Sequence, residues 1–110
     1  MALLVIANQQ PGPLPWQGTF NSVSDEMGTL IVSGSVWSQT PNQMIGFLVA
    51  LDGTVVGSAG IYSNLQSTHR AVVPTYIPIQ LTYGEHTIAL IPTPETTTDV
   101  NDFFTVALEY

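Results

Sequence analysis

Hydrophobic and polar residues alternate with a period of two along most of the chain. Between Gly28 and Trp37, one strand face would carry Leu30, Val32 and Val36, opposite a face rich in serine and threonine. The segment from Phe103 to Tyr110 alternates in the same way. No stretch between the prolines and glycines shows the 3.6-residue apolar stripe of a helix, so the pattern predicts an all-β fold.

The expected strands are bounded by turn-forming residues. Asp52-Gly53 is a strong two-residue hairpin signal, and Gly84 ends a short turn that begins at Thr82. The proline-rich segment Gln9–Gln17 is expected to form a loop between the first two strands. The predicted strands are Leu3–Ala7, Gly18–Val23, Gly28–Trp37, Met44–Leu51, Thr54–Ser63, Ala71–Leu81, Glu85–Ile91 and Phe103–Tyr110.

Two of these strands, Met44–Leu51 and Ala71–Leu81, are apolar on both faces. In a β-sandwich one face of each sheet packs on the core, and the other normally meets water. A second apolar face must therefore be covered by loops or by another copy of the chain. The pattern favours self-association.

The composition narrows the range of partners. Hydrophobic residues make up 45% of the chain and charged residues 8%, against about 25% charged residues in an average soluble domain. Arg70 is the only Lys or Arg, and the formal net charge is −7. Nucleic acids and anionic membranes are therefore disfavoured as partners, because binding to either requires several cationic side chains.

The length of 110 residues predicts a single domain over 1–110 with one continuous core. The chain has no cysteine and therefore forms no disulfide. Its sequence does not indicate whether it works in an oxidising or a reducing compartment. The apolar run Ala2–Ala7 lacks the basic flank of a signal peptide, and no segment has the roughly 18 apolar residues of a membrane span. The chain is expected to be soluble and not inserted in a membrane, with its localisation unknown.

Candidate catalytic residues form no recognisable motif. His69 and His86 could be combined with serines and Asp99, but the sequence has no G-x-S-x-G elbow and no orienting partner at a fixed spacing. Both histidines are expected to be structural. A glycosidase pair among Glu26, Glu85, Glu95 and Asp99 remains open, because such carboxylates meet only in the fold. The chain is predicted not to be an enzyme.

The segment Asp99–Asp102 precedes the last strand and carries three oxygen-bearing side chains, those of Asp99, Asn101 and Asp102. Hard cations such as Ca²⁺ bind this kind of ligand, although the EF-hand spacing is missing. Asp and Asn in such a loop more often cap a turn. The expectation is therefore no cofactor, with Ca²⁺ as the alternative.

A polar loop from Tyr62 to Arg70 connects two apolar strands and contains the only arginine. Sugar recognition uses planar hydrogen-bond donors for vicinal hydroxyls and an aromatic ring for the apolar sugar face. The alternative is a solvated loop whose arginine pairs with Glu85 or Glu109 of another subunit. The residue types alone leave both alternatives open.

The C-terminal half, with Gly84-Glu85-His86 followed by the strand Phe103–Glu109, resembles the closing strands of C1q/TNF-like jelly-roll domains. That resemblance implies a β-sandwich of two antiparallel sheets that assembles as a compact homotrimer. Within this superfamily, the middle of the chain is similar to the bacterial TNF-like fucose-binding lectin domain.

Tyr62-Ser63 and Ser67-Thr68-His69-Arg70 are similar to the sugar loop of that lectin domain. The lectin's second arginine has no counterpart here, and its loop is about two residues longer. The resemblance implies a glycan site near the subunit interface formed by Tyr62, Ser67, Thr68 and Arg70. The predicted function is a lectin-like homotrimer that binds cell-surface glycans. The alternative is a structural or receptor-contacting trimerisation module of a fibre or secreted assembly, without a sugar pocket.

Overall fold

The structure is a computed structural model that describes residues 2–110. These residues form β-strands joined by turns and loops, as the period-two alternation predicts. The strands are β1 (Leu3–Pro11), β2 (Trp16–Ser22), β3 (Glu26–Val36), β4 (Gln43–Leu51), β5 (Thr54–Ser63), β6 (Arg70–Ala71), β7 (Thr75–Leu81), β8 (Gly84–Pro92) and β9 (Phe103–Glu109).

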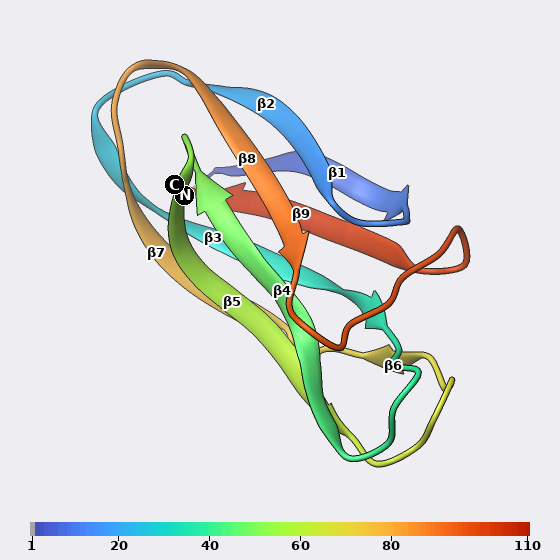
Figure 1. The fold of residues 1–110 in the computed structure, drawn as a ribbon. Coiled ribbons are helices and arrows are strands. Elements are labelled where there is room, and N and C mark those ends of the chain that lie inside the picture. The colour runs from blue at the N-terminus through green and yellow to red at the C-terminus, as the bar shows by residue number, and fades with distance from the viewer. Residues whose placement is uncertain (1) are drawn as a thin grey trace.

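The strands build two antiparallel sheets that pack face to face (Figure 1). We call the sheet with the order β1-β9-β3 the first sheet; its β3 also pairs with β6 and β7. The second sheet has the order β2-β8-β4-β5. Successive strands cross between the sheets except at the β4–β5 hairpin and between β6 and β7. This is a jelly-roll β-sandwich, which confirms the expected fold class.

The first strand extends further than its sequence suggests. The predicted loop Gln9–Gln17 is shorter, because β1 continues to Pro11 and β2 begins at Trp16. The pairing of β1 with β9 shifts register between Val5 and Ala7 and again between Ala7 and Gln10. Bulges and a terminal proline are tolerated because β1 lies at the edge of its sheet.

The predicted strand Ala71–Leu81 is wrong as a single element, since it is divided into β6 and β7. Pro74 has no N–H to donate to a sheet. Just before it, Val72 N donates to Gly34 O in the first sheet (2.9 Å), and Val73 N donates to Gly60 O in the second (3.1 Å). The chain therefore bridges the two sheets at this point instead of continuing one ladder.

The β4–β5 hairpin forms at Asp52-Gly53, as predicted. Both turn residues have positive φ, 51° and 84°, which a type I′ turn requires. The Asp52 carboxylate is also used, because its Oδ1 accepts a hydrogen bond from Thr87 N at 2.9 Å. The turn is thereby fastened to β8, the neighbour of β4.

The core lies between the two sheets and is continuous along the sandwich. Phe47 of β4 and Phe104 of β9 meet edge to face, with ring centroids 5.7 Å apart. This contact joins the two sheets through large apolar side chains. The largest fully buried side chains are those of Phe47, Phe104, Leu30, Ile45, Leu81, Ile88, Leu90, Leu108, Val32, Val36, Val49 and Val72.

The outer face of the first sheet carries a row of apolar residues that runs across its strands. Ile31 of β3 lies between Ala107 of β9 and Tyr76 of β7 in the register of the sheet, and Tyr76 is 66% exposed. Val5 of β1 continues this row and is exposed as well.

Residues 2–110 include no helix of the length and hydropathy needed to cross a membrane.

Candidate functional site

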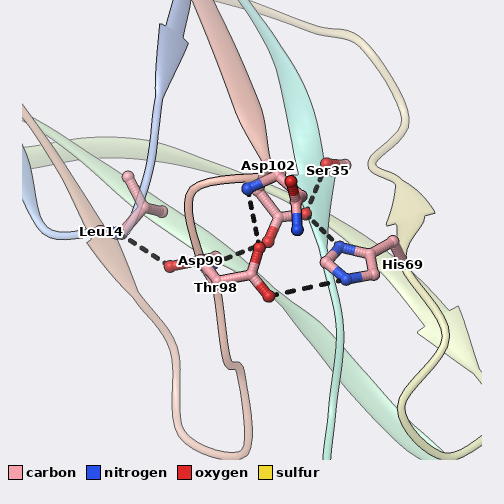
Figure 2. Close-up of polar contacts among 7 residues, drawn as sticks. Leu14, Ser35, His69, Thr98, Asp99 and Asp102 are labelled. Carbon is pink, nitrogen blue, oxygen red and sulfur yellow. Dashed lines mark hydrogen bonds and ion pairs between the residues drawn. The ribbon is translucent and has the colours of Figure 1, made fainter.

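A cluster of polar side chains lies at one end of the sandwich, where loop 12–15, loop 64–69 and the segment 93–102 meet (Figure 2). Its centre is Asp102, the residue before β9, which has no exposed surface. Thr98 Oγ1 accepts a hydrogen bond from Leu14 N at 2.8 Å. Gly12 N donates to Asp102 O at 2.8 Å. The N-terminal loop is therefore tied to the segment that carries Asp102.

The buried Asp102 carboxylate accepts three hydrogen bonds. Its Oδ1 accepts from Ser35 Oγ at 2.6 Å and from His69 Nδ1 at 2.7 Å. Its Oδ2 accepts from Asp99 N at 2.9 Å. A buried charge needs such partners, because each lost water contact must be replaced. Asp102 thus joins β3, the loop before β6 and its own turn.

Asp99 both shapes this turn and faces the histidine. Its Oδ1 accepts from Asn101 N at 2.8 Å, and its backbone carbonyl accepts from Asp102 N at 3.0 Å. Its Oδ2 lies 3.7 Å from His69 Nε2. Asn101 therefore contacts Asp99 through its backbone amide, and the expected turn capping describes the hydrogen bonds of this segment.

The structure adds His69 to the predicted metal candidates. One ligand atom each from His69, Asp99 and Asp102 lie within 4.8 Å of one another. An imidazole with two carboxylates is a donor set that suits zinc or another transition metal better than Ca²⁺, which prefers an all-oxygen shell. His69 does not stand out as a metal candidate in the sequence, because it is separated from Asp102 by 33 positions.

The cluster contains a serine, a histidine and an aspartate, but not in the order of a catalytic triad. In a triad the histidine lies between the serine and the aspartate and accepts the serine proton. Here the Ser35 hydroxyl donates to Asp102 Oδ1, and His69 Nδ1 donates to the same oxygen. His69 is therefore not placed to activate the Ser35 hydroxyl.

Trp37 flanks this cluster. Its ring centroid is 5.8 Å from that of His69, with the rings tilted by 41°. Its backbone pairs with Thr97 in both directions, at 3.0 and 2.7 Å. The indole Nε1 is buried and has no hydrogen-bond partner among residues 2–110. The indole thus packs beside the imidazole and contributes mainly apolar surface.

The loop with the predicted sugar residues is held at two points. Ser67, which has a positive φ of 56°, donates its N–H to Ser38 O at 2.7 Å. Two residues later, His69 is bound by Asp102. Thr68 lies between these anchors, is exposed, and donates only to Gln66 O within its own loop.

Arg70 and Tyr62 lie at the two ends of the same segment. Arg70 begins β6, is partly buried, and pairs with Val36 of β3. Tyr62 is near the end of β5, on the outer face of the second sheet, where its hydroxyl donates to Asn42 Oδ1 at 3.2 Å. No hydrogen bond within residues 2–110 joins two of the side chains of Tyr62, Ser67, Thr68 and Arg70.

The second histidine lies at the opposite end of β4. His86 of β8 is 6% exposed and stacks on Phe20 with centroids 5.5 Å apart. Its Nε2 donates to Thr82 O and its Nδ1 to Asp52 Oδ2, both at 2.7 Å. These two acceptors, the Thr82 carbonyl first, raise the pKa of His86 above its ordinary value despite burial.

The pKa of Asp52 shifts in the opposite direction to that of His86. Partial burial alone would raise the pKa of its carboxyl group, but the hydrogen bonds from His86 and from Thr87 N outweigh burial and lower it. Both shifts therefore favour the charged forms, an imidazolium beside a carboxylate. The structural role expected for His86 agrees with this geometry.

Comparison with known proteins identifies the fold. No protein-family model and no curated protein matches the sequence. A family 35 carbohydrate-binding module of Abf62 from Cellvibrio japonicus superposes with a TM-score of 0.60 at 10% identity, covering 99% of this chain and 94% of that chain. A family 35 carbohydrate-binding module from Clostridium thermocellum gives a TM-score of 0.54 at 10% identity and 98% coverage of both chains.

The fold also occurs in a different setting. Dimeric latent PorU from Porphyromonas gingivalis matches with a TM-score of 0.59 at 8% identity, over 97% of this chain but 12% of that chain. At these identities the similarity establishes the jelly-roll fold and not a ligand. None of these three structures supports the specific C1q/TNF-like assignment.

Proposed function

We propose that this chain is a non-catalytic carbohydrate-binding domain whose residues 1–110 fold as one unit. The observation that carries the proposal is the double anchoring of loop 64–69, by Ser67 N to Ser38 O and by His69 to the buried Asp102. A loop that is already ordered loses little conformational entropy when a ligand binds. Weak sugar ligands benefit most from this preorganisation.

Each predicted residue would have a distinct chemical role toward a glycan. The Arg70 guanidinium offers planar donors to vicinal hydroxyls, and Thr68 and Ser67 offer hydroxyl groups from the anchored loop. Tyr62 would supply a ring for the apolar face of a sugar, with its orientation fixed by Asn42. The fold of the family 35 carbohydrate-binding modules is compatible with this function.

We further propose that the domain self-associates, with a homotrimer as the arrangement implied by the C1q/TNF-like resemblance. The supporting observation is the apolar outer face of the first sheet, on which Val5, Ile31 and Tyr76 lie in one row. Soluble monomers rarely leave a large apolar sheet face to water. A trimerisation module without a sugar site is the second candidate function, and this same face supports it.

We propose that sugar binding requires no metal ion. The Asp102 carboxylate already accepts three protein hydrogen bonds, so the cluster is complete without a cation. If a cation does bind, His69, Asp99 and Asp102 are the residues that would hold it. Ca²⁺, held by Asp99, Asn101 and Asp102, is the alternative.

A glycan array tests the proposed function. Arg70→Ala should lose binding by about tenfold or more to the glycans that the wild-type chain retains, because one charged hydrogen-bonding contact is removed. Asn64→Ala, in the same loop and exposed, is the matched control and should bind like the wild type. If folded Arg70→Ala binds as well as the wild type, Arg70 is not part of the site. If the wild type gives no glycan signal, the carbohydrate proposal fails and the trimerisation module is the remaining candidate function.

A further inference from the structure

A groove crosses the outer face of the second sheet at a pair of facing glycines. Gly46 of β4 and Gly60 of β5 are direct partners in the ladder. On the same face, the neighbouring cross-strand pairs are Met44 with Tyr62 on one side and Leu48 with Ser58 on the other. The two glycines have no side chains, whereas the pairs on either side of them do, and a groove of about 510 Å³ lies at this position. This volume is within the range of small-molecule sites.

The third wall of the groove is the turn that follows β8. That strand ends at Pro92, and the chain then turns so that Thr93 N donates to Gly46 O at 3.0 Å. Gly46 N in turn donates to Thr96 Oγ1 at 3.0 Å. Because these bonds replace the ladder with β8, the turn holds Pro94 and Glu95 at the groove.

The floor of the groove consists of backbone and cannot accept side chains freely. A Cβ atom on Gly46 would lie 2.0 Å from Ala59 O, and one on Gly60 would lie 3.0 Å from Ile45 O. The first distance is far below any real contact, so this position requires glycine. The groove is therefore built into the pairing of β4 with β5.

Beside this floor stand two side chains with large apolar surfaces. Tyr62 is 51% exposed and Met44 is 66% exposed. Met44 precedes Gly46 and Tyr62 follows Gly60, each by two positions along its strand. Met44 lines the groove, and Tyr62 borders it as the cross-strand partner of Met44. The Tyr62 hydroxyl is held by Asn42, which limits the rotation of the ring. An aromatic ring next to an empty floor offers stacking to the C–H face of a pyranose.

The polar groups at the groove match sugar hydroxyls rather than an anion. The polar residues Gln43, Ser58 and Glu95 line it. Ser58 lies on the same face as the two glycines, and Gln43, the partner of the buried Ser63, borders the groove at the start of β4. They provide an amide and a hydroxyl, which can both donate to and accept from sugar hydroxyl groups, and a carboxylate, which accepts from them. No cationic residue lines the groove, and the chain carries a net charge of −7, so uronates and sialic acids would be repelled.

We propose that this groove is a second carbohydrate site, which takes one neutral pyranose unit with its ring against Tyr62 and its hydroxyls toward Gln43, Ser58 and Glu95. The proposal rests on the carbohydrate class of the proposed function. It uses a different surface from loop 64–69 and shares only Tyr62 with it. The two sites can therefore succeed or fail separately.

The test is a titration of the ¹⁵N-labelled chain with neutral oligosaccharides, namely cellohexaose, xylohexaose and mannohexaose, and with hexagalacturonate as the anionic probe. A neutral probe should shift the amide signals of Gly46, Ser58 and Gly60, and hexagalacturonate should not. Ser58→Phe fills the groove from an exposed strand position and should weaken binding by about tenfold or more. Val55→Phe, exposed on the same strand but outside the groove, is the matched control and should bind like the wild type.

Each other outcome identifies which proposal fails. Shifts confined to residues 67–70, with Ser58→Phe unaffected, would overturn the groove and leave the proposed function standing. Shifts confined to the groove, with Arg70→Ala unaffected, would support the groove and move the proposed function away from loop 64–69. No shift by any neutral probe at millimolar concentration, or a stronger response to hexagalacturonate, would overturn the groove proposal.

Discussion

His86 Nδ1 lies 2.7 Å from Asp52 Oδ2, and this contact joins the turn of the β4–β5 hairpin to β8. The other ring nitrogen of His86 faces the Thr82 carbonyl at the same distance. Since both neighbours are acceptors, the ring must carry two protons to satisfy them. The fold therefore favours the doubly protonated form of the buried His86, although the chain has almost no other cationic side chains.

This arrangement predicts that stability falls as the solution becomes alkaline. The pKa of His86 is raised in the fold, so its contribution is complete below the ordinary histidine pKa of about 6.5 and is lost as the pH rises through the raised pKa. Asp52, whose pKa is lowered, loses its contribution only as the pH falls through that lowered pKa. Urea unfolding across this range should show the alkaline loss in the wild type and not in His86→Gln. An equally steep loss in His86→Gln would contradict the assignment.

Replacing the buried carboxylate at the loop end should be costly. Asp102→Ala leaves Ser35 Oγ, His69 Nδ1 and the Asp99 amide without their acceptor, which should lower the free energy of unfolding by about 3 kcal/mol. Asp99→Asn keeps a side-chain oxygen at a partly exposed position and should cost less than about 1 kcal/mol. Chemical denaturation of both variants measures the difference. Similar values would show that Asp102 is not the main anchor.

Removing metal ions should leave the melting curve unchanged. The Asp102 carboxylate is satisfied by protein donors, so the loop end does not need a cation to compensate its charge. Differential scanning calorimetry before and after treatment with EDTA tests this expectation. A lower melting temperature after EDTA, restored by Zn²⁺ or Ca²⁺ and absent in Asp99→Asn, would instead assign a metal site to the cluster.

Gly46→Ala should destabilise the chain much more than Gly60→Ala. The added methyl group at position 46 would overlap the carbonyl oxygen of Ala59, whereas at position 60 it makes only a tight contact with Ile45 O. We expect a loss of about 3 kcal/mol or more for Gly46→Ala and about 1 kcal/mol for Gly60→Ala. Thermal melts of the two variants, compared with the wild type, provide the measurement. Equal effects would mean that the β4–β5 pairing relaxes around the new side chain.

The apolar face of the first sheet should control the oligomeric state. Tyr76→Glu places a charge at the β7 end of the apolar row on that face and should shift sedimentation from a homotrimer to a monomer. Tyr83→Glu is the matched control, because Tyr83 is 76% exposed in the turn before β8 and belongs to neither sheet face. A wild-type chain that sediments as a monomer at micromolar concentration would contradict both the trimer and the trimerisation module.

Local features of the sequence were sufficient to predict most of the strands. Alternation over Gly28–Trp37 and Met44–Leu51 agrees with β3 and β4 to within about two residues, and Asp52-Gly53 forms the expected hairpin. The errors occur where a nonlocal contact changes a local preference. Segment 72–74 forms hydrogen bonds to Gly34 in the first sheet and to Gly60 in the second. Strand β1 continues into the proline-rich segment as far as Pro11, because β9 offers it partners up to Phe103.

The candidate sites depended on the tertiary structure. Arg70 and Tyr62 were visible as residue types, but the anchors of their loop, Asp102 and Ser38, are far away in the sequence. The pairing of the two strands that carry Gly46 and Gly60 follows from the position of the hairpin turn at Asp52-Gly53. The groove, however, is also lined by the turn after β8, which the sequence does not place there. Alternation is a property of the backbone within one strand, so a sequence of this kind determines its strands and turns. Which side chains meet is decided by antiparallel pairing and by crossings between sheets, which bring together residues more than 30 positions apart, such as His69 with Asp102 and His86 with Asp52.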